Sequence, residues 1–324
     1  MQRDFKMQNT FLVLCAVAMT WLSSVAASIV YPEFEVGMCR EVDCFNRSSK
    51  AIEKRQELYH LADPEYVDLF TEIYNTHVAA AKQDCHKGDY RIPRIVHQIW
   101  LGSPVPEKYF KWMESWVGYY GWEYKLWTEE DVKGMKLQNR VLYEASRNYG
   151  EKADILRLEI LYQYGGVYAD VDYECTNHEI IDELHQSFDF YIGFEPLEHG
   201  YVKRFNMFKL CNAIIGAKQY HPLIKDLIVN LRANYYAYRD RCGPVERTGP
   251  SYITRIICEY EKRHTHNLRN IYLPCTFFYP YSEADLNFFQ ENPQLGVPLF
   301  NETVGIHYWS GSWLPQRQNS SSIK

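Results

Sequence analysis

The stretch KADILRLEILYQYGGVYADVDY, residues 152–173, decides the fold that this sequence predicts. In its first part, apolar side chains recur at the spacings of three and four residues that are typical of a helix. Gly165 then supplies a residue that ends a helix at little conformational cost. The short apolar segment 167–169 leads directly to Asp170 and Asp172. We therefore predict a helix, a Gly-Gly stop and a buried strand that ends in two carboxylates.

Asp170 and Asp172 are the first candidate functional residues. Alternate side chains of an extended chain share a face, so both carboxylates are expected to point the same way while Val171 faces the core. Two hard oxygen ligands at the carboxyl end of a buried strand suit a divalent cation, which in turn would hold a diphosphate. Carboxylates that flank buried residues are costly unless they are paired or bind a metal.

Asp154 and Arg157 lie three residues apart on the expected helix, and two interpretations stay open. The first is a surface ion pair that contributes a few tenths of a kcal/mol. In the second, Asp154 accepts hydrogen bonds from sugar hydroxyls while Arg157 faces a phosphate or sugar. Spacing alone favours the first interpretation.

The composition is that of a globular protein. The chain has 324 residues, of which 46% are hydrophobic and 16% aromatic, and its formal net charge is −6. This length allows one large domain or two small ones. The acidic balance argues against a nucleic-acid partner. The many aromatic residues are compatible with a sugar-handling site, but they are equally expected in a core.

The N-terminus has the pattern of a targeting segment. Arg3 and Lys6 precede an apolar run over residues 11–22, and Val25-Ala26-Ala27 is a small-residue cleavage pattern. We predict residues 1–27 as a signal peptide or signal anchor, with cleavage favoured. The remainder would be secreted or lie in the lumen of the secretory pathway (ER or Golgi), where an uncleaved segment would attach it to the membrane.

The cysteines and the glycosylation sequons agree with export. Outside the leader there are eight cysteines, an even number that permits disulfides without revealing their connectivity. No paired spacing of cysteine and histidine suggests structural zinc. Three acceptor tripeptides for N-glycosylation begin at Asn46, Asn301 and Asn319.

Residues 28–90 are predicted as an N-terminal helical extension, with helices at 48–61 and 64–82, and residues 91–324 as the main domain. Strands are expected at 95–102, 123–127, 167–169, 189–194 and 212–217. Helices are expected at 106–120, from Thr128, and at 177–186, 221–237 and 247–261. This alternation of strands and helices predicts an open α/β sheet that binds ligands at the carboxyl ends of its strands.

Two further aromatic or basic positions have open interpretations. Trp100, near the end of the first strand, either stacks on a flat ring such as a nucleobase or lies in the core, and the pattern favours the core. His307 is either structural or completes a metal shell, since imidazole suits Mn²⁺-type ions. In the second case Trp309 and Trp313 would wall the site and exclude water.

Three ordered motifs resemble the DXD sugar-binding glycosyltransferases. They are IPRIVHQIW at 92–100, ADILR at 153–157 and GGVYADVD at 165–172, and a Gly-Ser-Trp tail follows at 311–313. The family includes the initiating α-1,6-mannosyltransferase, inositol-phosphoceramide mannosyltransferases, α-1,4-galactosyltransferases and, distantly, the glucosylating clostridial toxins. The resemblance, over residues 91–315, implies a GT-A-like Rossmann-type domain that binds a nucleotide sugar and Mn²⁺ or Mg²⁺ and retains anomeric configuration.

The resemblance also implies roles for individual residues in binding the donor. Trp100 matches the position that stacks on the base. Asp154 and Arg157 match catalytic-site residues that hold the donor sugar and phosphate, and Tyr168 lies beside them. Asp170 and Asp172 match the ligands of the metal, ribose and diphosphate, with the second aspartate meeting the metal most directly.

Other matches concern the closing tail and the acceptor. His307, Ser312 and Trp313 match the tail that closes over the donor. Asn212 and the segment Thr248-Gly249-Pro250 lie where contacts to donor or acceptor are expected. The resemblance names no protein nucleophile. It implies instead a front-face displacement in which the leaving phosphate takes the acceptor proton.

The expected function is transfer of a hexose, mannose or galactose, from GDP-mannose or a UDP-hexose to a glycan or glycolipid. The sequence identifies neither the base nor the acceptor. One alternative is a phosphatase with Asp170 as nucleophile and Asp172 as acid, although that class has its Asp-x-Asp on the first strand. The other is a non-catalytic sugar-binding protein of the same fold.

Overall fold

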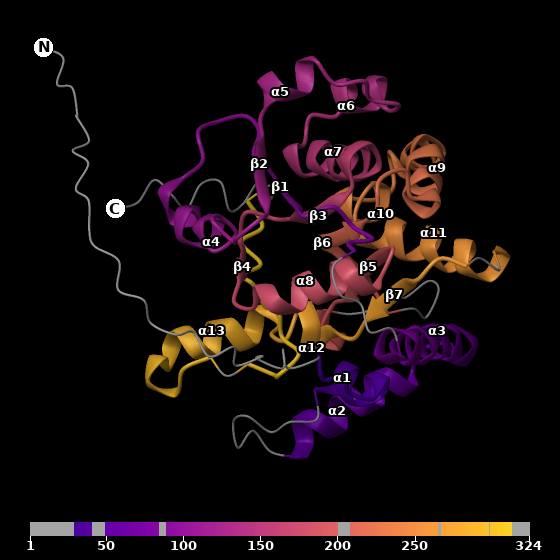
Figure 1. Ribbon diagram of the computed structural model, residues 1–324, viewed down its shortest axis with the longest axis vertical. Helices are drawn as coiled ribbons and strands as arrows, with labels where there is room; N and C mark the ends of the chain where they lie inside the picture. The colour runs from indigo at the N-terminus through magenta and orange to yellow at the C-terminus, as the bar shows by residue number, and fades with distance from the viewer. Residues whose placement is uncertain are drawn as a thin grey trace, which may run out of the picture.

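The computed structural model describes residues 29–40, 49–83, 89–199, 208–264, 267–297 and 299–312. A six-stranded sheet in the order β2-β1-β3-β6-β5-β7 runs through them, and helices surround it (Figure 1). β6 is antiparallel to both of its neighbours, while the other pairs are parallel. The strands are β1 Ile95–Ile99, β2 Glu123–Trp127, β3 Gly166–Ala169, β5 Phe190–Phe194, β6 Leu210–Ala217 and β7 Asn270–Leu273. The predicted α/β fold class is thereby confirmed.

Helix α7, Tyr149–Tyr164, is the central helix of the fold. It contacts β1, β3 and β6 on the sheet as well as α9, Pro222–Tyr238. Nine of its residues are buried, from Glu151 through Leu161. A helix that is covered on most sides belongs to the interior of a protein, so polar residues on α7 need partners. The other helices of this part are α5 Glu129–Lys133, α6 Arg140–Ala145, α8 His178–Ser187, α10 Pro244–Arg247, α11 Pro250–Arg263, α12 Cys275–Phe278 and α13 Glu283–Glu291.

The N-terminal extension packs on the main sheet. Its helices are α1 Phe34–Cys39, α2 Ser49–His60 and α3 Pro64–Gln83. The bounds of α2 and α3 are close to the predicted ones, whereas α1 was not predicted. α3 lies against β7 and α1 against α12, and Figure 1 shows these indigo and purple helices beside orange β7 and gold α12. The ring of Phe70 meets that of Tyr272 edge-on with 4.8 Å between centroids. The extension therefore shares one core with the sheet, and the boundary at residue 90 stays a prediction.

The predicted targeting segment, residues 1–27, lies outside the described residues. Within the described part of the chain, no helix combines the length and the apolar character that a bilayer crossing requires.

A second, two-stranded sheet joins the middle of the chain to its end. β4, Tyr173–Cys175, is antiparallel to β8, Gly305–His307, and the register sets Tyr173 opposite His307. β4 begins one residue after Asp172. This small sheet thus brings the C-terminal segment to the two aspartates.

The predicted helix over residues 106–120 is wrong. A 3₁₀ turn, Glu107–Tyr109, and a short α4, Phe110–Glu114, replace it. The helix ends because Ser115 accepts a hydrogen bond from the backbone of Cys175, at 2.8 Å. Trp116 then turns inward and donates its indole N–H to the carbonyl of Tyr173, also at 2.8 Å. Bonds to β4 therefore outweigh continuation of the helix.

The predicted start of the helix over residues 247–261 is also wrong. α10 ends at Arg247 and α11 begins at Pro250. Thr248, between them, is fully buried and its hydroxyl donates to Asp154 at 2.7 Å. The break thus delivers a polar side chain to the interior.

The predicted disulfides are not found among the six cysteines that the structure describes. Cys39, Cys175, Cys211, Cys242, Cys258 and Cys275 form no disulfide with one another. Cys44 and Cys85 lie outside the described residues. Burial raises the pKa of Cys175 and of Cys275 to about 12, so these thiols are packed as small apolar groups.

The Gly-Gly stop after α7 is held by a buried histidine. Gly165 and Gly166 have φ values of 68° and 97°, which favour glycine. Nε2 of His97 donates to the carbonyl of Gly165 at 2.8 Å, while the indole N–H of Trp127 donates to Nδ1 at 3.1 Å. Both ring nitrogens of His97 are therefore satisfied only when the imidazole is neutral.

We predict that His97 makes the fold sensitive to mild acid. Burial lowers the pKa of His97 to about 4, against about 6.5 in an unfolded chain. Below that unfolded value the unfolded state takes up a proton that the folded state excludes. The free energy of unfolding should therefore decrease as the pH is lowered from about 6.5 to about 4, by up to about 1.4 kcal/mol per pH unit.

Urea unfolding at several pH values tests this expectation, with His97→Gln as the matched variant. Glutamine keeps an N–H for Gly165 but does not titrate. The difference between wild type and variant cancels other groups, including His185, whose pKa burial lowers to about 3. Parallel pH profiles for the two proteins would contradict the assignment to His97.

Candidate functional site

The two aspartates lie in a turn and not, as predicted, on an extended strand. β3 ends at Ala169, and the backbone N–H of Tyr173 donates to the carbonyl of Asp170 at 3.0 Å. Strand alternation therefore does not explain their common orientation. The turn does, because it reverses the chain into β4 and leaves both carboxylates facing the end of β8.

Asp170, Asp172 and His307 form one group, which we call the Asp-Asp-His cluster. Each offers a ligand atom, and these atoms all lie within 4.8 Å of one another. Nε2 of His307 lies 3.3 Å from Oδ1 of Asp172 and 4.0 Å from Oδ2 of Asp170. Asp172 and His307 are buried and Asp170 is partly exposed. The cluster therefore has one open side.

The C-terminal segment fixes Asp172 in place. The backbone N–H of Ser310 donates to Oδ2 of Asp172 at 2.8 Å, and that of Tyr308 donates to its carbonyl at 2.9 Å. The hydroxyl of Tyr109 donates to that of Ser310 at 3.3 Å. Residues near positions 109 and 310 thus together orient the carboxylate of Asp172.

The charges of the cluster suit a divalent cation. Burial opposes ionisation of Asp172, but the charge of His307 and hydrogen bonds from His307 and Ser310 hold its pKa well below the ordinary value. Burial likewise opposes protonation of His307, but Asp172 raises its pKa. Asp172 and His307 therefore favour each other's charged forms. Two carboxylates and an imidazole are also a donor set for Mn²⁺ or Mg²⁺.

Arg157 is the centre of a buried polar group beside the cluster. Its guanidinium lies 3.2 Å from Oδ1 of Asp154 and 3.3 Å from Oδ1 of Asp170. It also donates to the carbonyl of Asn212 and lies over the ring of Tyr168, 4.4 Å from its centroid. Arg157 therefore links α7 to the Asp170 end of β3.

Asp154 and Arg157 do not form the surface ion pair that spacing favoured. Both are buried, and Asp154 also accepts hydrogen bonds from Nδ2 of Asn212 and from the hydroxyl of Thr248, each at 2.7 Å. Burial raises the pKa of Asp154 to about 6, although Arg157 and these two donors oppose the rise. The sequence suggested Asn212 and Thr248 as ligand contacts. The structure joins both to Asp154.

Gln98 and Tyr124 are residues of the site that the sequence did not reveal. Nε2 of Gln98 donates to the carbonyl of Asp170 at 3.2 Å, and the hydroxyl of Tyr124 donates to Oε1 of Gln98 at 2.7 Å. Gln98 is fully buried. The sequence did contain a sign of this role: Gln98 is an amide in an otherwise largely apolar strand, and a buried amide needs hydrogen-bond partners.

Trp100 and the tail lie at the edge of this site. The ring of Trp100 is partly exposed, with its centroid 5.1 Å from that of Tyr109. Since Tyr109 contacts Ser310, which bonds Asp172, Trp100 is connected to the Asp-Asp-His cluster through two residues. Ser312 is exposed at the end of the described chain, and Trp313 lies outside the described residues.

We predict that Gly305→Ala detaches His307 from the aspartates. A methyl group at Gly305 would lie 2.1 Å from the carbonyl oxygen of Glu174, so β4 and β8 must separate. We expect a loss of about 1–3 kcal/mol in stability and weakening of Mn²⁺ binding by about tenfold or more, measured by calorimetric titration.

Gly134→Ala is the matched control for this variant. No atom lies within 4 Å of its added methyl group, and its φ of −85° suits alanine. It should melt and bind Mn²⁺ like the wild type. Undiminished Mn²⁺ binding by Gly305→Ala would refute the role given to the β4–β8 pair.

Comparison with known proteins locates the sugar-binding motif. Residues 106–190 match the model of the glycosyltransferase sugar-binding region containing a DXD motif. The chain is 27% identical to inositol phosphoceramide mannosyltransferase 3 of Schizosaccharomyces pombe, over 59% of this chain and 49% of that protein. It is also 27% identical to the uncharacterized glycosyltransferase L373 of Acanthamoeba polyphaga mimivirus, over 54% of this chain and 68% of that one.

The chain spans about half the length of the inositol phosphoceramide mannosyltransferases that it matches. Among solved structures, the PaToxG glycosyltransferase is similar, with a TM-score of 0.41 and 15% identity over 74% of this chain and 85% of that one. The family model includes β3, both aspartates of the cluster, and α7 with Asp154 and Arg157.

Proposed function

We propose that this protein transfers a hexose from a nucleoside diphosphate sugar to a glycan or glycolipid, because residues 106–190 match the DXD-containing sugar-binding region of glycosyltransferases. The observation that carries this proposal is the convergence of Asp170, Asp172 and His307 beside the buried pair Asp154 and Arg157. The names of the relatives favour mannose, and thus GDP-mannose, over a UDP-hexose.

In this proposal the Asp-Asp-His cluster holds Mn²⁺ or Mg²⁺, with His307 in its neutral form. The bound ion would neutralise charge on the diphosphate leaving group. The open side of the cluster, next to Asp170, is where the diphosphate would lie. Asp172 is held by Ser310 and Tyr308, so its carboxylate is oriented before any ligand binds.

The remaining residues of the site orient the donor. Arg157 supplies a fixed positive charge between Asp154 and Asp170. Asp154, with Asn212 and Thr248, faces the sugar, and Trp100 stacks on the base. Trp309, with Ser312 and Trp313 beyond it, closes the site against water, which would otherwise take the sugar.

The proposed chemistry is a front-face displacement with retention. The bond between the anomeric carbon and the phosphate oxygen breaks, and a bond to the acceptor oxygen forms on the same face. The acceptor proton passes to the leaving diphosphate oxygen. Arg157 and the charge at the cluster stabilise that oxygen, so no protein nucleophile is required.

The compartment and the acceptor follow from sequence features and relatives. The predicted targeting segment and the sequons favour the lumen of the secretory pathway, including the Golgi, or secretion. The relatives named for inositol phosphoceramide favour a membrane glycolipid as acceptor. A lumenal enzyme held near the membrane by its N-terminal segment would reach such a lipid.

The test is donor hydrolysis in the absence of acceptor. The full chain is incubated with Mn²⁺ and a panel of GDP- and UDP-hexoses, and release of the nucleoside diphosphate is recorded. Slow hydrolysis of one donor, abolished by chelation of Mn²⁺, is expected. Phosphatase activity without use of any nucleotide sugar would favour the alternative in which Asp170 is a nucleophile.

A further inference from the structure

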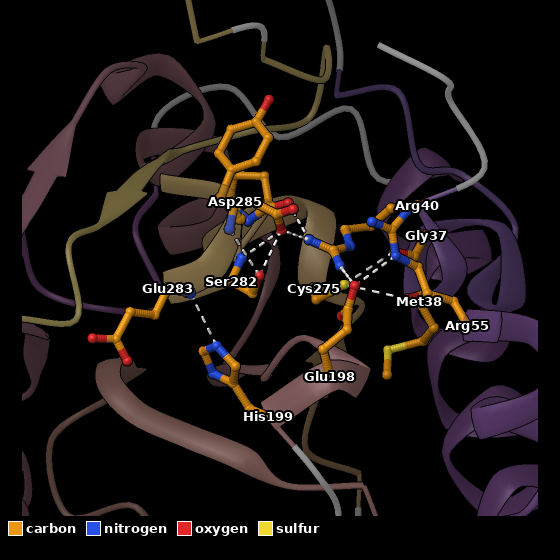
Figure 2. A network of polar contacts seen from close by, with 12 residues as sticks. Gly37, Met38, Arg40, Arg55, Glu198, His199, Cys275, Ser282, Glu283 and Asp285 are labelled. Atoms are coloured by element: carbon orange, nitrogen blue, oxygen red, sulfur yellow. Dashed lines mark hydrogen bonds and ion pairs between the residues drawn. The ribbon is translucent and has the colours of Figure 1, made fainter. Parts of the chain in front are cut away.

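The N-terminal extension contributes one buried arginine to the interior of the protein. Arg40, directly after α1, has only 3% of its surface exposed. Its guanidinium pairs with Glu198 and, at 3.0 Å, with Asp285, and it donates to the carbonyl of Pro280 at 2.8 Å (Figure 2). A buried charge with this many partners constrains each of them.

The first path from Arg40 leads through the turn at residues 280–285. Oδ2 of Asp285 also accepts from the backbone N–H and the hydroxyl of Ser282, at 2.9 and 2.7 Å, as a capping box of α13. Arg40 therefore holds both ends of the turn. Within it, the carbonyl of Tyr281 accepts from the indole N–H of Trp309 at 2.9 Å.

The second path leads through Glu198 and its neighbour. Arg40 and Arg55 both bind Oε1 of Glu198. The next residue, His199, accepts a hydrogen bond from the backbone N–H of Glu283 at 3.1 Å, as Figure 2 shows. Its ring meets Trp309 edge-on, with centroids 4.3 Å apart. Both paths therefore end at the same indole.

Trp309 connects these paths to the Asp-Asp-His cluster. Its φ of 49° is unusual for a large residue, so its conformation depends on its surroundings. Its ring lies 4.2 Å from that of His307, centroid to centroid. Ser310, the next residue, donates its backbone N–H to Asp172. A shift of Trp309 would thus change the ring contact with His307 and displace the Ser310 N–H that binds Asp172.

We propose that Arg40 is a positioning residue for the Asp-Asp-His cluster, acting through Trp309. The N-terminal helices are then part of the catalytic unit and not a spacer that precedes it. This inference rests on the proposed function for its consequence in metal binding. The mechanical link from Arg40 to Ser310 is independent of that function.

The experiment compares the full-length wild type with Arg40→Lys, Trp309→Phe and the double variant. Lysine keeps the charge but loses the fork that reaches Pro280, Glu198 and Asp285 together. Phenylalanine keeps an aromatic ring at this position but removes the N–H that binds Tyr281, together with the second ring of the indole. We expect each single variant to bind Mn²⁺ about tenfold more weakly, by paramagnetic resonance titration, as for other partners of metal ligands.

Three further readouts identify a positioning role. The double variant should bind Mn²⁺ no more weakly than either single variant, because both changes break the same connection from Arg40 through Trp309 to the cluster. Hydrogen exchange in the segment 305–312 should be about tenfold faster in Arg40→Lys without any metal. Arg91→Lys is the control, because Arg91 pairs with Asp189 at the amino end of β5, opposite the cluster, at 3.4 Å.

Each outcome decides the proposal. Unchanged Mn²⁺ binding and exchange in Arg40→Lys, or additive effects in the double variant, would overturn it. If Arg40→Lys does not fold, Asp285→Asn takes its place, since it leaves the bonds of Arg40 to Glu198 and Pro280. If the wild type binds no Mn²⁺, the proposed function fails, and exchange at Ser310 still decides whether Arg40 positions the tail.

Discussion

Asp172→Asn is expected to lower donor turnover by about 10³-fold or more and to abolish Mn²⁺ binding in the micromolar range. The substitution removes the charge of a proposed metal ligand, whose carboxylate accepts from the N–H of Ser310 and whose backbone carbonyl accepts from that of Tyr308. A metal at a diphosphate leaving group contributes several kcal/mol to transition-state stabilisation, and each 1.4 kcal/mol corresponds to a factor of ten. Turnover is measured as release of nucleoside diphosphate at saturating Mn²⁺.

The fold should survive this substitution, because asparagine retains an oxygen that accepts from Ser310. Asp189→Asn is the matched control. Asp189 also has its pKa lowered, by Arg269, Lys218 and Arg91 against the effect of burial, but it lies at the other end of the sheet. It should turn over donor like the wild type. Normal activity of Asp172→Asn would eliminate the metal site from the mechanism.

Arg157→Met is expected to cost about 3–5 kcal/mol of stability and to reduce turnover strongly. The variant leaves Asp154 without its charged partner in a buried place, and a broken buried ion pair has this order of cost. The loss should be greater at neutral pH than near pH 5. The pKa of Asp154 is already raised to about 6, and without Arg157 it rises further, so mild acid neutralises the carboxyl.

The double variant Arg157→Met with Asp154→Asn separates stability from catalysis. Removal of the second charge should restore part of the stability, seen as a higher urea midpoint, because no carboxylate remains unpaired there. Turnover should stay low, since the positive charge beside Asp170 is still absent. Recovery of turnover together with stability would show that Arg157 acts on the fold alone.

The sequence predicted the layered sheet because its strands are short apolar runs that Gly and Pro punctuate. β2 matched residue by residue, and β3 ends where the first aspartate begins. The sequence did not reveal that the helix predicted over residues 106–120 is interrupted. Its end depends on bonds from Ser115 and Trp116 to β4, which is distant in sequence.

The sequence predicted which residues form the Asp-Asp-His cluster, but it did not predict the turn that brings them together. Asp170, Asp172 and His307 were named from their chemistry, and they do lie together. The stated reason, strand alternation, was wrong because a turn carries the aspartates. Arg40 was missed altogether, because a charged residue after a short helix has no local sign of burial.

The pairing of β4 with β8 has a consequence for how the protein acquires activity during synthesis. Glu174 and Tyr308, which this ribbon brings into hydrogen-bonding contact, are 134 residues apart. Closing so long a loop is slow and entropically unfavourable until the sheet between them has formed. On the ribosome, β1 to β7 emerge before β8 does. The nascent chain therefore folds its main sheet first and forms the Asp-Asp-His cluster only after β8 has emerged.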